Sequence, residues 1–162
     1  MKISHLLIAA GFTFFCNSST AQNIKFAGTH PPDTAVLNLL SRYEQAARNF
    51  KTVAERDAKR KPLLSNGYFY HGLDGAPVSL DSLTRRQTKN NFSPASDSLF
   101  SFTLFQYENT AVFSYKVYGK GMDKGKPFEN TNSSLILMSK ESGSWKIIAD
   151  ILGQDPKQLK TK

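Results

Sequence analysis

The feature that most constrains the fold is a change in the spacing of apolar residues along the chain. Between Thr34 and Arg56, apolar side chains recur every three or four residues, which predicts one long amphipathic helix. After Pro94 come long segments of strand-forming residues separated by short turns, which predict consecutive antiparallel hairpins. Helices followed by a meandering sheet are typical of an α+β protein. A curved antiparallel sheet packed around the long N-terminal helix would bury both apolar faces.

Local signals predict the remaining elements. Asp33 or Thr34 can cap the first helix, and Ser79 can cap a later one, because their side chains accept hydrogen bonds from free backbone N–H groups. The apolar stripe of the first helix comprises Val36, Leu37, Leu40, Tyr43, Ala47, Phe50 and Ala54. We expect further helices at 57–64 and 80–90, and strands at 67–72, 99–108, 111–120, 128–140 and 145–152.

Residues 1–21 have the pattern of a signal peptide. Lys2 supplies the positive start, and the apolar run from Leu6 to Phe15 is too short to span a bilayer permanently. Small residues at Ser19 and Ala21 predict cleavage before Gln22 and therefore a periplasmic or secreted protein with no transmembrane segment. The alternative is a lipoprotein modified at Cys16, which the bulky residue before that cysteine disfavours.

Length, composition and charge set further limits. The 162 residues suffice for one domain, which we place at 34–152, between an extended leader at 22–33 and a basic tail at 153–162. A single cysteine excludes an internal disulfide and a multi-cysteine metal site, and no motif calls for a cofactor. The net charge is +8, but Lys59-Arg60-Lys61 and Arg85-Arg86 lack interleaved aromatic residues. We therefore predict solvated surface rather than nucleic-acid binding, with anionic envelope polymers or lipid headgroups as the alternative partners.

Four motifs, in this order, resemble the nuclear transport factor 2-like superfamily in its SnoaL-like branch of small bacterial domains. They are Tyr43–Ala46, Leu64–Gly75, Ala111–Tyr115 and Gly143–Asp150. The resemblance spans residues 34–152 and implies a cone-shaped, cystatin-like fold with a pocket between sheet and helices. It also implies a domain that is often dimeric through the outer face of its sheet. The closing motif departs from the family, which often has Ala-x-His where this chain has Ala149-Asp150.

Asp150 and His71 are the candidate catalytic residues. In a dry pocket Asp150 would have a raised pKa and could act as a base or an acid. The alternative is that strict alternation places Asp150 with Lys146 and Ile148, as well as Leu152, on a face that meets solvent. His71 can exchange protons near neutral pH, or it can simply bond a turn carbonyl. A His71–Asp150 pair across the mouth of the cone would orient the imidazole for proton abstraction.

Aromatic residues are the candidate ligand-binding groups. Tyrosine hydroxyls that line an apolar cavity can hold an oxygen of a ligand or polarise a carbonyl. The alternative for each is ordinary core and cross-strand packing. The candidates are Tyr43, Tyr68, Tyr70, Tyr115 and Trp145.

Three functions compete. The leading hypothesis is an exported domain that binds a small apolar molecule in its pocket without chemistry of its own. The second is a cofactor-independent isomerase or dehydratase that uses Asp150 or His71 as its base. The third is a dimeric envelope interaction module, because the strand at 99–108 has large apolar residues on both faces. Alternation places Phe100, Phe102 and Leu104 on one face, and Leu99, Phe105 and Tyr107 on the other.

Overall fold

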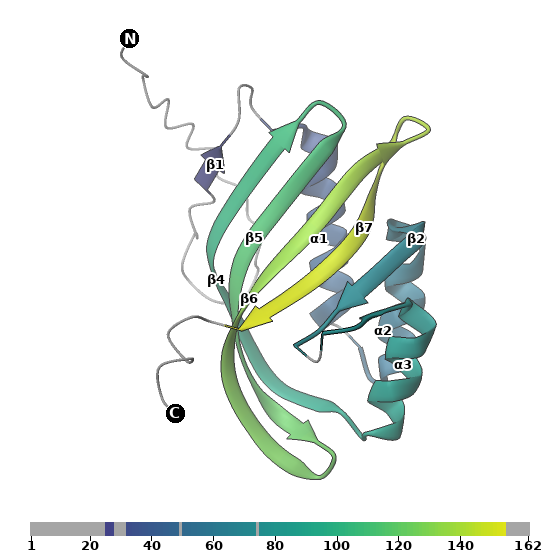
Figure 1. The fold of residues 1–162 in the computed structure, drawn as a ribbon, viewed down its shortest axis with the longest axis vertical. Helices are drawn as coiled ribbons and strands as arrows, with labels where there is room; N and C mark the ends of the chain where they lie inside the picture. Colours follow the sequence, from purple (N-terminus) through teal and green to yellow (C-terminus); the bar gives the residue numbers. More distant parts are fainter. Residues whose placement is uncertain (1–24, 28–31, 49, 74, 155–162) are drawn as a thin grey trace.

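The computed structural model describes residues 25–27, 32–48, 50–73 and 75–154 (Figure 1). The signal peptide, its cleavage before Gln22, Cys16 and most of the basic tail lie outside these residues. The helical elements are α1 (Thr34–Arg48), α2 (Val53–Arg60), a short 3-10 helix η1 (Lys61–Leu63) and α3 (Leu80–Lys89). The strands are β1 (Lys25–Ala27), β2 (Leu64–His71), β3 (Pro77–Val78), β4 (Ser93–Tyr107), β5 (Thr110–Asp123), β6 (Lys126–Glu141) and β7 (Ser144–Gln154).

All seven strands form one sheet in the order β1-β4-β5-β6-β7-β2-β3. The hairpin strands β4 to β7 are antiparallel, as predicted, whereas β1 joins β4 and β2 joins β7 in parallel. Ser142 and Gly143 connect β6 to β7 with φ angles of 47° and 82°, which is the backbone of a tight hairpin turn. The sheet curves strongly, and α1 lies behind it on the concave side (Figure 1).

The helix predicted at 34–56 is two helices, so its bounds and those of the helix at 57–64 were wrong. The Thr52 side chain accepts a hydrogen bond from the backbone N–H of Glu55 at 3.1 Å. The Glu55 carboxylate in turn accepts a hydrogen bond from the backbone N–H of Lys51 at 2.8 Å. This exchange resembles a capping box and starts a new helix at Val53. Ala54, assigned to the apolar stripe, is exposed as a result.

Asp33 attaches the start of α1 to the sheet. One carboxylate oxygen accepts from the backbone N–H of Ala35 at 2.8 Å, and the other accepts from the indole N–H of Trp145 at 3.0 Å. The Asp33 backbone N–H donates to the side chain of Gln106 at 2.8 Å. The hydrogen bonds from Ala35 and then Trp145 lower the pKa of Asp33. The predicted cap at Asp33 is confirmed, and so is the cap of α3, where Ser79 accepts from the N–H of Ser82.

Two β-bulges change which residues face the core. In β4 the register shifts around Ser101, whose φ is 57°, and Leu99 is buried in the core. The prediction that Leu99 shares a face with Phe105 is therefore wrong. In β7, Met138 pairs with Ile147 and Leu137 with Ala149, so Ile148 has no partner in the ladder. An extra residue reverses the alternation beyond it, because side chains alternate with a period of two.

Candidate functional site

The buried face of α2 is charged. Val53, Arg56, Asp57 and Arg60 are the buried residues of this helix, at the i, i+3, i+4, i+7 spacing that defines one helical face. In most surface helices that face is apolar, because a buried charge is costly unless it is paired. The structure must therefore supply partners for all three charged side chains.

Asp57 links α2 to α3. Its carboxylate accepts two hydrogen bonds from the guanidinium of Arg56, at 2.7 and 3.0 Å, and one from the hydroxyl of Thr84 at 2.6 Å. Arg56 also donates to the side chain of Gln87 at 2.6 Å. Both of these α3 partners lie on the side of that helix that meets α2.

Asp150 links α2 to the sheet and to α1. The bulge at Ile148 places Asp150 opposite Ile136 on the core face, rather than on the solvent face that regular alternation predicted. Its carboxylate accepts hydrogen bonds from Tyr43 Oη at 3.1 Å, Ser134 Oγ at 3.2 Å and Arg60 Nη2 at 3.3 Å. Asp150 therefore bonds to side chains from α1, β6 and α2.

Arg60 completes a buried row of alternating charge. Its guanidinium lies over the ring of Tyr43, 4.0 Å from the centroid, and its Nη1 is 3.8 Å from a carboxylate oxygen of Asp57. The row runs Arg56, Asp57, Arg60, Asp150 and has no net charge. We call these four residues the charge row.

Burial dominates the electrostatics of this interior. It raises the pKa of Asp150, and the positive charge of Arg60 and the hydrogen bond from Ser134 offset only part of that effect. Burial also raises the pKa values of Tyr68 and Tyr115. The Tyr68 hydroxyl and the Arg60 Nε–H are buried without a hydrogen-bond partner among the described residues.

The predicted site residues divide into two groups. Tyr43 and Tyr68 are buried near Asp150, Tyr115 is buried opposite Ser134 in the strand register, and Tyr70 pairs with Asp150 in the parallel ladder. Trp145 is also buried but bonds to Asp33, where it holds the start of α1.

His71 belongs with neither group. It pairs with Ile151, one residue beyond the Tyr70–Asp150 pair. Successive strand residues point to opposite faces, so the register directs His71 away from the core face that Asp150 occupies. The His71–Asp150 pair proposed from the sequence is therefore not formed in this structure.

Sequence reasoning missed the rest of the charge row. Arg60 was assigned to solvated surface together with Lys59 and Lys61, and this assignment is wrong for Arg60, which is only 7% exposed. The available signal was the pair Thr52 and Glu55, which fixes where α2 starts and hence which of its residues share a face. No sequence motif or spacing marks Ser134 or Thr84 as a hydrogen-bond partner of the charge row.

Two hollows lie elsewhere on the described surface. One, of about 280 Å³, is lined by Arg42, Gln45, Ala46, Lys59 and Leu63. The other, of about 360 Å³, is lined by Ala27, Phe105, Gln106, Tyr107, Thr110 and Val112. Asp150 is not among the residues that line either hollow. In the part of the chain that the structure describes, no three His, Cys, Asp or Glu side chains are grouped to hold a metal, and no helix is long and apolar enough to cross a membrane.

The outer face of the sheet carries a continuous row of apolar residues. In register across β1, β4, β5, β6, β7 and β2 stand Ala27, Phe105, Val112, Leu137, Ala149 and Phe69. We call these six residues the outer apolar row. Phe105 is 47% exposed and Phe69 37%, while neighbouring Tyr107 is 72% exposed. The helices lie on the other side and leave this face uncovered (Figure 1).

No protein-family model and no curated protein matches the sequence. Several solved structures do match the fold of the chain. An NTF2-like (nuclear transport factor 2-like) protein from Cytophaga hutchinsonii is 16% identical with a TM-score of 0.62, over 75% of this chain and 97% of that one. The chain has the NTF2-like fold.

Two further structures share the NTF2-like fold. An NTF2-like protein of unknown function in nutrient uptake from Rhodospirillum rubrum is 15% identical with a TM-score of 0.59, over 70% of this chain and 95% of that one. The CaMKII hub from S. rosetta is 11% identical with a TM-score of 0.58, over 78% and 98%. At these identities the likeness concerns the fold alone, and it confirms the fold that the four sequence motifs indicated.

Proposed function

We propose that the chain is a self-association domain that forms a homodimer through the outer face of its sheet. The observation that carries this proposal is the outer apolar row, which crosses six strands with no polar residue. Phe105 and Phe69 are exposed, although Ala149 within the row is fully buried. Exposed apolar surface of this kind is typical of a site that another protein covers. In a twofold dimer each copy presents the same patch, so one apolar row covers another.

The buried charges of the interior support the same choice. A domain whose main task is to bind a small apolar molecule needs an apolar cavity, whereas the carboxylate of Asp150 in this interior bonds to the polar groups of Tyr43, Ser134 and Arg60. The NTF2-like fold also serves in the S. rosetta protein that is named a hub. Self-association therefore agrees with the surface, the interior and the fold.

Sedimentation equilibrium of the wild type and of Phe105→Glu tests the proposal. We expect a wild-type dimer at micromolar concentration, and a dissociation constant raised on the order of 100-fold by a charge in the apolar interface. The matched control is Met122→Glu, since Met122 is 40% exposed at the far end of β5. A wild type that is monomeric at about 50 micromolar, where the association free energy would be weaker than about 6 kcal/mol, would overturn the proposal. Equal effects of Phe105→Glu and Met122→Glu on the dissociation constant would also overturn it.

Proton transfer at Asp150 is a second candidate function. It is favoured by the raised pKa of that carboxyl and by the nearby Tyr68 hydroxyl, which is buried without a partner and could donate to a carbonyl oxygen. Such a site would serve a cofactor-independent isomerase or dehydratase. NMR of small ketones and enones in D₂O would detect catalysed α-proton exchange. Asp150→Asn should abolish that exchange while Asp123→Asn, a change outside the core, should not.

A further inference from the structure

Two basic segments that lie far apart in the sequence meet at one end of the molecule. The backbone N–H of Lys124, in the β5–β6 turn, donates to the carbonyl of Asn90, just after α3, at 2.8 Å. The rings of Phe92 and Phe128 stack beside this contact with centroids 5.9 Å apart. Figure 1 shows the hairpin tip and the C-terminal end of α3 together at the bottom of the view.

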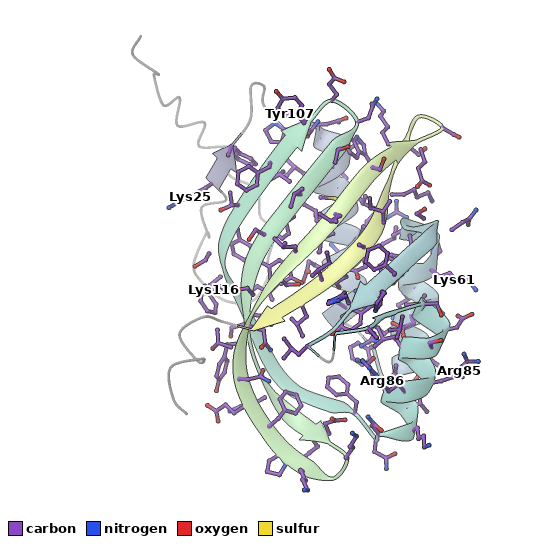
Figure 2. The ribbon with its side chains drawn as sticks, in the orientation of Figure 1. Lys25, Lys61, Arg85, Arg86, Tyr107 and Lys116 are labelled. Atoms are coloured by element: carbon purple, nitrogen blue, oxygen red, sulfur yellow. The ribbon has the colours of Figure 1, made fainter. Side chains whose placement is uncertain are left out.

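The cations at this end outnumber the acids. The exposed cations are Arg85 and Lys89 on α3, and Lys120, Lys124 and Lys126 on the hairpin; we call these five residues the basic end. Figure 2 shows Arg85 at the outer side of α3, pointing away from the sheet. The acids of the hairpin are Asp123 and Glu129, which stand opposite Lys126 and Lys120 in the strand register. Glu129 also accepts a hydrogen bond from the Tyr118 hydroxyl at 2.6 Å.

An apolar side chain lies between Lys120 and Lys124 along the hairpin. Met122, two residues before Lys124, is 40% exposed. Cations around an exposed apolar side chain suit the interface of an anionic bilayer, where the headgroups attract the charges and the apolar group enters the acyl boundary. Nucleic-acid binding would favour exposed aromatic faces for stacking, but Phe92 and Phe128 stack on each other.

We propose that the basic end docks on an anionic lipid surface, with Met122 inserted at the interface. This interaction is independent of the proposed dimer, because Phe105 and Tyr107 lie toward the opposite end of the sheet. Figure 2 shows Tyr107 at the top, far from the hairpin tip. Each cation held near such a surface strengthens binding by about fivefold at moderate salt.

Co-sedimentation with vesicles tests this proposal. The probes are vesicles of phosphatidylcholine alone and with one part in three of phosphatidylglycerol. We expect binding to the anionic vesicles only, and loss of that binding as salt increases. The variant K89Q/K124N/K126Q should weaken binding on the order of 100-fold, given about fivefold for each cation removed. Asn suits position 124, where φ is 53°.

The control variant K25Q/K61Q/K140Q removes the same charge from exposed lysines elsewhere on the molecule, and binding should change by less than about threefold. Met122→Ser should weaken binding to anionic vesicles with no effect on the dimer. Equal losses in the two triple variants would overturn the proposal. So would equal binding to neutral vesicles, or tighter binding to DNA than to anionic vesicles. Repeating the assay in Phe105→Glu separates this result from that of the dimer proposal.

Discussion

The two faces of the sheet differ in an unusual way, because ions are buried within the apolar core on one face and large apolar side chains are exposed on the other. The concave face, which the helices cover, buries the four ions of the charge row, with Asp150 only 8% exposed. The outer face leaves large apolar side chains such as Phe105 in water. A buried ion is tolerated only when its neighbours pair with it, whereas an exposed apolar row is tolerated most easily when a partner covers it. The buried ions therefore find their charged partners within one copy, whereas large side chains of the outer apolar row have no cover among the described residues.

The largest expected effect comes from breaking the charge row at its centre. Arg60→Ala removes the ion-pair partner of Asp150 and the cation over the ring of Tyr43. We expect the free energy of unfolding in urea to fall by about 3–5 kcal/mol, because a buried carboxylate is left uncompensated. The control is Lys59→Ala, whose exposed ion pair with Glu55 should matter little. Similar losses in the two variants would mean that the row contributes nothing specific.

Substitutions on the outer face should weaken the dimer and leave the stability of the monomer almost unchanged. The double variant F69T/F105T shortens two exposed members of the outer apolar row. We expect the dissociation constant of the dimer to rise on the order of 100-fold, at roughly 1.5 kcal/mol for each apolar side chain. The unfolding free energy of the monomer, measured below the dissociation constant, should hardly change. A large loss of monomer stability would show that this face packs within one copy instead.

A smaller effect tests how α2 is placed. Thr52→Ala removes the side-chain acceptor for the N–H of Glu55 at the start of the helix. We expect a loss of about 1 kcal/mol in unfolding free energy, typical of an N-cap. Thr88→Ala, at an exposed position of α3, serves as the control in the same denaturation experiment. An unchanged stability for Thr52→Ala would mean that contacts of the charge row alone set the start of α2.

The smallest effect is a pH dependence. Burial raises the pKa of Asp150 above its unfolded value, so the folded state binds this proton more tightly than the unfolded state does. The resulting stabilisation is fully present below the unfolded pKa of 3.8 and is lost as pH rises through the folded pKa. The stability of the wild type relative to Asp150→Asn should therefore fall as pH increases from 3 toward neutrality in urea titrations. The opposite trend would show that Arg60 outweighs burial.

The candidate site could be predicted from the sequence only in part. Asp150 was a candidate because a carboxylate is unusual in a mostly apolar strand, and Tyr43 was one of the candidate tyrosines. Strict alternation would have directed Asp150 to solvent. The bulge at Ile148 reversed that direction. A bulge depends on how two strands fit together, and the strand that carries it gives no local sign of it. The same reason explains why Leu99 was placed on the wrong face.

The sequence by itself determined the elements: the apolar stripe of α1, the cap of α3, the hairpin turn at Ser142-Gly143 and the order of motifs that indicated the NTF2-like fold. These follow from local backbone preferences and from periodicity, which act over a few residues. Only the tertiary structure decided that Arg60 meets Asp150, 90 positions further along the chain. That contact depends on the register of the sheet and on the packing of α2 against it, which is where long-range geometry overrides local preference.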